Sequence, residues 1–298
     1  MSSLKARLFT NVARITRFKY WYFPRANDPE FYRKLRRKQA KIHKPSRSIR
    51  KKFEVAETTF NGQKLYKISP RQPKTKASKA FIYLHGGAMT FPIMRAHWQA
   101  IADLVERSGQ TAFVPFYPLA PDARHDEIQD HISKVYHHIT KSHAPQNLSV
   151  IGDSAGGSLA LFLASTLDTK SQPKHFVLFS PAVDYSFDNP ELDAMEKIDP
   201  LIPIATVRRP LKYFYNNCQP NDPCINLLKA DFSHSGHLTI YNGGLDLLSN
   251  DIAKLHGVLT KQDVPHDYIY EPELFHAWPV LDFPESREVR EKVAKIIS

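Results

Sequence analysis

Apolar residues change their spacing along the chain, and the spacing predicts which segments are helical and which are extended. Near the N-terminus they recur every three or four residues, as on one face of an amphipathic helix. These positions are Leu4, Leu8, Val12, Ile15 and Phe18. A second helix is predicted from Asp28, which is suited to an N-cap, and Pro29, which is suited to a first turn, towards Ile42.

Beyond residue 53 the pattern becomes that of an α/β protein. Asn61-Gly62 is the turn dipeptide of a β-hairpin, with apolar residues on both sides. Short apolar runs then predict strands at 80–84, 111–116, 148–151, 176–179, 238–241 and 268–270. Helical stretches at 122–143, 154–167, 249–263 and 284–297 separate them, and prolines interrupt the rhythm over 185–225. This alternation predicts a mostly parallel central sheet with helices on both faces.

Charge divides the 298 residues unevenly. Residues 1–52 hold 17 Lys and Arg against Asp28 and Glu30, a net charge of +15, so the total of +11 leaves the remaining chain at −4. A nucleic-acid-binding core is therefore disfavoured. No stretch approaches the ~20 consecutive apolar residues of a membrane-spanning helix. We therefore expect a basic N-terminal helical segment (1–52) and an α/β domain (53–298).

Three interpretations of the basic segment are open. Its helices can cover the main domain, or attach peripherally to an anionic membrane surface. An organellar transit peptide is the third, because the first 27 residues contain no acid. A secretory signal is disfavoured, since there is no uninterrupted apolar region. Two cysteines, Cys218 and Cys224, favour a reducing, cytoplasmic compartment; a small loop disulfide remains open, and we interpret them as incidental.

A G-x-S-x-G motif spans residues 152–156, between a predicted strand and a predicted helix. This is the place of a nucleophile elbow, where small flanking residues let the backbone bend sharply and expose the serine hydroxyl. Ser154 is thus a candidate nucleophile. The competing interpretation is a glycine-rich turn with a helix-capping serine.

His85-Gly86-Gly87-Ala88 follows the strand at 80–84, the position of an oxyanion loop. Backbone N–H groups of such a loop can bind a developing oxyanion. Ala88 replaces a third glycine but keeps its N–H. The alternative is a plain Gly-Gly turn.

A serine nucleophile needs a base and an orienting carboxylate, in the chain order Ser, Asp or Glu, His. Among the residues after Ser154, Asp246 and His276 each lie just beyond the C-terminal end of a predicted strand. Other acids and histidines lie inside helices or before strands. Position therefore selects Asp246 and His276.

The chain resembles the hormone-sensitive lipase family of α/β-hydrolases. The matching motifs, in order, are HGGA (85–88), YPLAPD (117–122), GDSAGG (152–157), SPAVD (180–184), GGLDLLSND (243–251) and FHAW (275–278). The resemblance implies Ser154 as nucleophile, His276 as base, Asp246 as its orienter, and oxyanion donors on the backbone of Gly86, Gly87 and Ala155. It also implies a cap built from the N-terminal helices and the 185–225 insertion. Pro118 stands where the family usually has Arg, and HAW where HGF is commoner, which concerns packing and substrate preference.

The leading hypothesis is a serine carboxylesterase that cleaves short- to medium-chain esters of small molecules. A deacetylase or amidase with the same triad is an alternative, and so is a non-catalytic ligand-binding member of the fold. The N-terminal aromatic residues suggest an apolar acyl pocket, or are core contacts; they are Phe9, Phe18, Tyr20, Trp21, Tyr22 and Phe23. No cofactor or metal motif is present. We expect a monomer or homodimer, cytoplasmic or peripheral at the inner membrane face.

Overall fold

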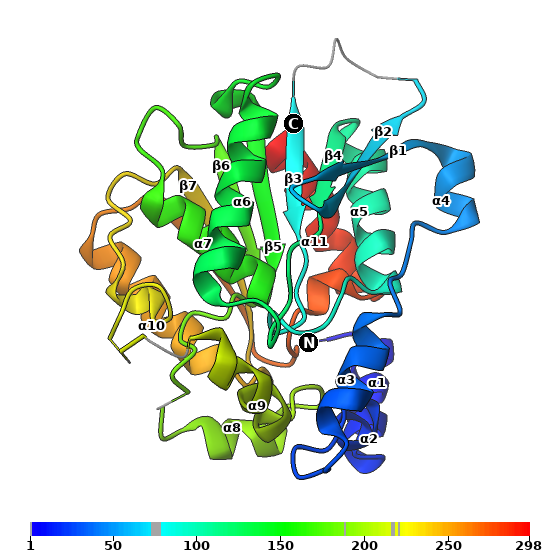
Figure 1. Cartoon of the computed structure of the whole chain (residues 1–298), viewed down its shortest axis with the longest axis vertical. Helices are drawn as coiled ribbons and strands as arrows, with labels where there is room; N and C mark the ends of the chain where they lie inside the picture. Colours follow the sequence, from blue (N-terminus) through cyan, green and yellow to red (C-terminus); the bar gives the residue numbers. More distant parts are fainter. Residues whose placement is uncertain (1, 73–78, 188, 216–217, 220) are drawn as a thin grey trace.

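A single eight-stranded sheet runs through the computed structural model (Figure 1). The structure describes residues 2–72, 79–187, 189–215, 218–219 and 221–298, without the side chains of Trp21 and Tyr22. The strands are β1 (Phe53–Phe60), β2 (Gln63–Pro70), β3 (Ala80–Leu84), β4 (Thr111–Pro115), β5 (Leu148–Asp153), β6 (His175–Phe179), β7 (His237–Gly243) and β8 (His266–Glu271). Their spatial order is β1-β2-β4-β3-β5-β6-β7-β8. β2 is antiparallel to β1 and β4, and the other neighbours are parallel. The predicted fold class and hairpin are confirmed, with Phe60 paired to Gln63 across Asn61-Gly62.

Helices cover both faces of the sheet, so successive strand residues enter two different cores. On one face lie α6 (His125–Thr140), α7 (Ala155–Thr166) and α10 (Ser249–Lys261); on the other lie α5 (Arg95–Ser108) and α11 (Pro284–Ile297) (Figure 1). In β5, for example, Val150 joins the first core and Ile151 the second. Burial on both faces explains why these strands read as continuous apolar runs.

Several element boundaries differ from the predictions. α5 has no counterpart among the predicted elements. The first helix divides at Arg17, whose φ is +50°, into α1 (Leu4–Ile15) and α2 (Phe18–Tyr22). The predicted start at Asp28 is also wrong: the Asp28 carboxylate accepts the N–H of Glu30 at 2.8 Å, and α3 (Phe31–Gln39) begins after this turn.

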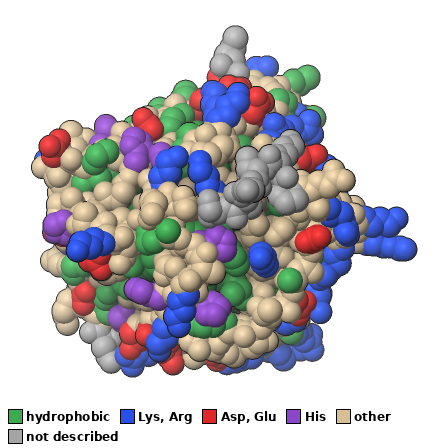
Figure 2. All heavy atoms as spheres, turned by 90° about the horizontal axis from the view of Figure 1, so that it is seen from above, with side chains coloured by type: hydrophobic (Ala, Val, Ile, Leu, Met, Phe, Trp, Pro, Cys, Tyr) green, Lys and Arg blue, Asp and Glu red, His purple; other side chains and the backbone are tan. Residues whose placement is uncertain are grey.

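The N-terminal segment contributes to two parts of the molecule. α1, α2 and α3 gather with α8 (Leu192–Ile198) and α9 (Ile204–Phe214) beyond the carboxyl ends of the parallel strands, at the bottom of Figure 1. α4 (Arg47–Lys52) lies apart from them, beside β1. Figure 2, seen from above, shows Lys and Arg side chains gathered on the edge that carries α4 and the β1–β2 hairpin. The basic charge is therefore divided between two places.

Three short 3₁₀ helices complete the described elements, and they are η1 (Pro145–Asn147), η2 (Leu227–Lys229) and η3 (Trp278–Val280). Among the helices that the structure describes, none combines the length and apolar character needed to cross a membrane.

Candidate active site

Ser154 lies on a strained turn between β5 and α7. Its φ of 52° and ψ of −120° lie in a region that non-glycine residues rarely occupy. The turn is held by backbone hydrogen bonds: the Ser154 N–H donates to Phe179 O at 2.9 Å, and the Ser154 carbonyl accepts the N–H of Ala182 at 3.1 Å. The local backbone thus presents the Ser154 side chain in a fixed direction.

The glycines of this turn are required by close approach of the backbone. A Cβ on Gly156 would lie 2.0 Å from the carbonyl oxygen of Leu84, in β3. A Cβ on Gly152 would lie 2.3 Å from the carbonyl oxygen of Gly156. α7 can therefore pack tightly onto the sheet only without side chains at these two positions.

His276 and Asp246 are brought together from two loops. The loops follow β8 and β7, and His276 Nδ1 lies 3.0 and 2.9 Å from the two Asp246 carboxylate oxygens. Asp246 is fully buried, and its Oδ1 also accepts the N–H of Leu248 at 2.9 Å. Because a carboxylate can only accept, Nδ1 carries the hydrogen and Nε2 is left as the basic nitrogen.

The surroundings of His276 raise its pKa. Burial alone would lower the pKa of His276, but the charge of Asp246 and its hydrogen bond, together with the charges of Asp199 and Asp153, outweigh burial. The residue can therefore take up a proton more readily than an isolated imidazole.

A cavity of about 840 Å³ adjoins these residues, and both Ser154 and His276 line it. Gly87 and Ala88 line it too, with φ of 120° and 53°. Gly86 packs directly on the turn, since a Cβ there would lie 3.0 Å from Ser154 Cβ. Ala155 is buried as the first residue of α7, where an N–H has no partner within the helix. Within the described residues, the N–H groups of these four candidate donors bind no protein acceptor.

Aromatic side chains from the N-terminal helices line the same cavity. They are Phe9, Phe18 and Phe23. Tyr20, in contrast, is 45% exposed, and the side chains of Trp21 and Tyr22 lie outside the described part of the structure. Three of the six predicted aromatic residues therefore contribute to an apolar wall.

Sequence reasoning missed the partners of Asp153, the residue before Ser154. The buried Asp153 carboxylate accepts the Tyr83 hydroxyl at 2.8 Å and lies 3.2 Å from His97 Nε2, on α5. His97 Nδ1 accepts the N–H of Met94 at 2.9 Å, so Nε2 carries the hydrogen and donates it to Asp153. Burial would raise the pKa of Asp153, but His97 and Tyr83 outweigh burial and lower it. The sequence offered one sign of these contacts, namely that Asp153 is a charged residue at the end of an otherwise apolar strand and so needs polar partners.

Asp199, in the insertion, was also missed. Its Oδ1 accepts the N–H groups of Leu201 and Ile202 at 2.5 and 2.8 Å, and its Oδ2 accepts the N–H of Leu247 at 2.6 Å. Leu247 directly follows Asp246, so Asp199 connects the insertion to the Asp246 loop. Burial, followed by the charge of Asp246, raises the pKa of Asp199 to about 6.

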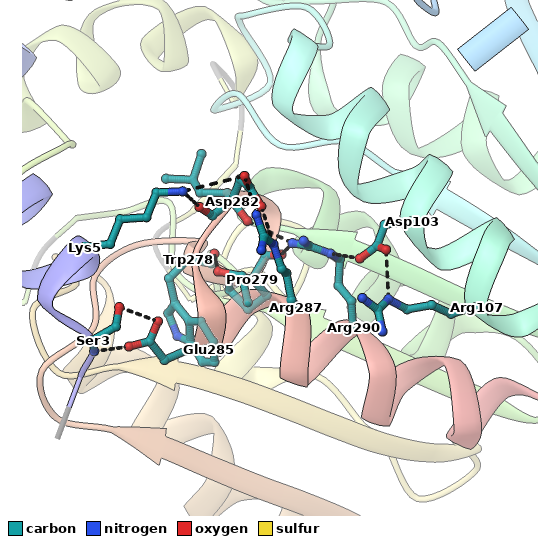
Figure 3. A network of polar contacts seen from close by, with 12 residues as sticks. Ser3, Lys5, Asp103, Arg107, Trp278, Pro279, Asp282, Glu285, Arg287 and Arg290 are labelled. Atoms are coloured by element: carbon teal, nitrogen blue, oxygen red, sulfur yellow. Dashed lines mark hydrogen bonds and ion pairs between the residues drawn. The ribbon is translucent and has the colours of Figure 1, made fainter. Parts of the chain in front are cut away.

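The loop after His276 is held by a buried arginine of α11. Arg290 Nη1 donates to the carbonyls of Pro279 and Leu281 at 2.5 and 2.9 Å, and its Nε donates to Asp103 of α5 at 2.7 Å (Figure 3). Figure 3 also shows α1 reaching this loop, where Lys5 approaches Asp282. The position of the His276 loop thus depends on α11, α5 and α1.

Metal-ligating side chains gather at one place among the described residues, and it lies away from the cavity. The group consists of His125, Cys218 and Cys224. None of the three lines the cavity that holds Ser154 and His276.

Comparisons with known proteins agree with this architecture. A family model described as the alpha/beta hydrolase fold matches residues 81–280. The chain is 26% identical over 232 residues to an esterase of Acinetobacter venetianus, an alignment covering 74% of this chain and 75% of that protein. It is 25% identical over 228 residues to a triacylglycerol lipase of Mycobacterium tuberculosis. That alignment covers 76% of this chain and 47% of the lipase, so the chain spans about half of the lipase's length. A solved structure of a hormone-sensitive lipase from a metagenome library is similar in fold, with a TM-score of 0.80 at 19% identity, covering 98% of this chain and 97% of that one.

Proposed function

Since the chain belongs to the α/β-hydrolase fold family, we propose that it is a serine carboxylesterase. Ser154 is the nucleophile, His276 is the general base, and Asp246 is the acid that orients His276. The observation that carries the proposal is the His276–Asp246 pair, buried beside a cavity that Ser154 enters on a strained turn. The esterase and lipase names of similar proteins support the same class of reaction.

The proposed reaction proceeds in two halves. His276 Nε2 takes the proton of the Ser154 hydroxyl as its oxygen attacks the ester carbonyl, and Asp246 stabilises the imidazolium. Backbone N–H groups of Gly86, Gly87, Ala88 and Ala155 bind the oxyanion, a contribution that is commonly the largest electrostatic one. His276 then gives its proton to the leaving alcohol. Water, deprotonated by His276, cleaves the acyl-enzyme and restores Ser154.

Activity-based labelling tests the nucleophile. A fluorophosphonate probe should label the wild type and the control variant Ser165→Ala, which alters another serine of α7. Ser154→Ala should lose labelling and reduce ester turnover by several orders of magnitude while the circular dichroism spectrum stays unchanged. Labelling of a folded Ser154→Ala protein at wild-type level would disprove the assignment.

We infer short- to medium-chain acyl esters as substrates. The apolar wall of Phe9, Phe18 and Phe23 supports an acyl pocket within the cavity of about 840 Å³. A series of p-nitrophenyl esters from acetyl to palmitoyl should therefore show a maximum before the long chains. Equal rates along the series would contradict the pocket.

Rates on an anilide and on an acetylated sugar, measured beside the matching simple ester, separate an amidase and a deacetylase from a carboxylesterase. Turnover of any of these substrates excludes a purely ligand-binding protein.

We further infer that a cap over the cavity is formed by α1 to α3 and the 185–225 insertion. The Lys19 ammonium, in α2, donates to the carbonyl of Asp199 at 2.9 Å and to that of Glu196. The Thr206 hydroxyl, in α9, donates to the carbonyl of Pro24 at 3.0 Å. These contacts support treating the two segments as one covering layer.

The outer face of α1 supports an additional proposal, attachment to an anionic lipid surface. Its four aliphatic side chains face solvent, with Leu4 75%, Leu8 61%, Val12 49% and Ile15 82% exposed. The small residues Ala6, Thr10 and Ala13 form the buried side instead. An exposed apolar stripe on a basic helix is typical of helices that lie in a membrane interface.

Charge favours lipid over a second copy of the chain as the occupant of this face. At 100° per residue, the exposed Arg7 flanks one side of the stripe and Lys5 the other, and exposed Arg17 follows the helix. Cations beside the stripe attract anionic headgroups but repel the same cations on a second copy. Phe9, on the inner side of α1, lines the cavity, so docking would bring lipid esters close to it.

Co-sedimentation with vesicles tests the attachment. Phosphatidylglycerol vesicles should bind the wild type and the control variant Ile42→Gln. Phosphatidylcholine vesicles should bind both proteins weakly. Leu8→Gln/Ile15→Gln should lose this binding without losing turnover of soluble esters. Binding that does not depend on anionic lipid, or a wild-type dimer that becomes monomeric in the double variant, would overturn the proposal.

We propose a cytoplasmic location, with this attachment at the inner membrane face. The two thiols, which the structure leaves free, support a reducing compartment.

A further inference from the structure

A second cluster of reactive side chains lies where the insertion meets the α/β domain. His125 is the first residue of α6, and Cys218 and Cys224 follow α9. Cys218 Sγ lies 2.9 Å from His125 Nε2 and 3.0 Å from Cys224 Sγ. All three side chains are half-buried, and their ligand atoms lie within 4.8 Å of one another. The cluster is separate from the proposed catalytic residues.

We propose that His125, Cys218 and Cys224 form a binding site for a thiophilic divalent cation of the zinc type. Two thiolates and an imidazole are the ligands that zinc prefers. The Zn–S and Zn–N bond lengths of about 2.3 and 2.0–2.1 Å place two ligands of a tetrahedral ion roughly 3.5–3.8 Å apart. The two observed contacts therefore need to open by less than about 1 Å to admit the ion.

The surroundings of the thiols favour a cation. The Asp222 carboxylate accepts the N–H of Cys224 at 3.0 Å, which places an acid in the same turn. The two thiols and this carboxylate thus lie together in one half-buried stretch of the insertion, so two thiolates there would need a balancing positive charge. A divalent ion supplies the compensating charge: two thiol protons leave to solvent as two sulfur–metal bonds form.

A disulfide explains the cluster less well. The Sγ–Sγ separation of 3.0 Å exceeds the about 2.05 Å of a disulfide bond, and the structure holds both thiols free. A disulfide would give His125 no role. The imidazole Nδ1 is buried without a hydrogen-bond partner in the described residues, so its polar contact with this cluster is made through Nε2.

An ion at this position would fasten the insertion to α6. Phe214, the last residue of α9, packs edge-on against His125 with ring centroids 6.0 Å apart. Phe214 also contacts Tyr185 at 5.4 Å, and Tyr185 lines the cavity. Loss of the ion should therefore loosen the cap more than the sheet.

Cobalt substitution tests the site without relying on enzyme activity. The full-length protein, reduced and treated with a chelator, is titrated with Co²⁺. The wild type should bind one equivalent, with tetrahedral d–d bands and a thiolate-to-cobalt charge-transfer band, and Zn²⁺ should displace the cobalt. Binding should release about two protons per ion.

Variants decide whether these three residues are the ligands. Cys218→Ser, Cys224→Ser and His125→Ala should each weaken binding by at least about tenfold, because each removes a direct ligand and even the loss of a hydrogen-bond partner of a ligand costs about 10–100-fold. The control His137→Ala, an exposed histidine of α6, should bind as the wild type does. Zn²⁺ should raise the Tm of the wild type and the control but not of Cys218→Ser/Cys224→Ser.

Two metal-binding results would overturn the proposal, and so would the finding of a disulfide. One is the absence of a charge-transfer band in protein whose thiols all react with a disulfide reagent. The other is unchanged metal affinity in the cysteine variants, which would identify adventitious surface binding. A 218–224 disulfide found by mass spectrometry in protein purified under reducing conditions, with no bound metal, would assign the cluster to a disulfide instead.

Discussion

The strand ends around Ser154 and the N-terminal helices that cover them are fixed by different kinds of contact. Around Ser154, backbone lies against backbone: Gly156 leaves no room for a Cβ beside Leu84, and the turn is closed by hydrogen bonds to Phe179 and Ala182. α1 instead rests on the small residues Ala6 and Ala13 and turns its four aliphatic side chains outward.

The two kinds of contact tolerate substitutions to different degrees. Backbone contact admits almost no added volume, whereas an exposed helix face accepts any residue that keeps the helix. We therefore expect severe effects near the strand ends and small effects on the outside of α1.

Among the variants compared below, Asp246→Asn should have the largest effect on the reaction. Removing the carboxylate takes away the partner that fixes the His276 tautomer, so kcat should fall roughly 10³–10⁴-fold. Because Asp246 raises the pKa of His276, the acid limb of kcat/KM should lie above the ordinary histidine value of 6.5 in the wild type and move to lower pH in the variant. Asp251→Asn, a buried acid nearby on α10, is the control; an unmoved acid limb would contradict the assignment.

Gly156→Ala should destabilise the protein by about 3 kcal/mol or more, because its Cβ would collide with the backbone of β3. The matched control is Gly257→Ala in α10, where a Cβ meets nothing within 4 Å. That variant should gain about 0.5–1 kcal/mol from the lower chain entropy of alanine. Urea unfolding of both variants measures the contrast, and equal stabilities would refute it.

Arg290→Met should cost about 2–3 kcal/mol, since it leaves two loop carbonyls without their donor and removes one of the two arginines that pair with Asp103, which keeps Arg107. Arg287→Met breaks an exposed pair with Asp282 and should cost at most about 1 kcal/mol. Thermal unfolding compares the two, and ester turnover should fall only in the Arg290 variant. A fully active Arg290 variant would show that the His276 loop holds its position without this arginine.

Leu8→Gln should change stability by no more than about 0.5 kcal/mol, because the side chain is exposed. Leu35→Ala in α3 removes a fully buried side chain of the same N-terminal segment and should cost about 2–5 kcal/mol. Chemical unfolding measures both. A strongly destabilised Leu8 variant would mean that the stripe packs against protein in solution.

The sequence predicted the strands from their apolar runs, and it placed the proposed triad because each of its three residues lies at, or a few residues beyond, the C-terminal end of a strand. Ser154, Asp246 and His276 could be placed by their order along the chain, and the pair His276–Asp246 does meet. The recurrence of apolar residues every three or four positions identified the stripe of α1 but not that it faces solvent. Periodicity alone cannot say which side of a helix is buried when the opposite side carries alanines.

Contacts between distant segments could not be predicted. His97 reaches Asp153 from a helix that was not predicted, and Asp199 reaches the Asp246 loop from a segment broken by prolines. His125 meets Cys218 across 93 positions of the chain, a spacing that matches no local metal motif. Each of these pairings depends on the tertiary arrangement of elements rather than on a local pattern.

The connection through Asp199 sets a design rule for chimaeras of this enzyme. Its backbone carbonyl receives the ammonium of Lys19, while its carboxylate holds the N–H of Leu247. Anyone grafting a foreign covering layer onto this scaffold to change substrate scope must therefore transplant or rebuild an acceptor at position 199. Without that acceptor, a graft that folds well would still leave the Asp246 loop, which contacts the His276 imidazole, without its hydrogen bond to the covering layer.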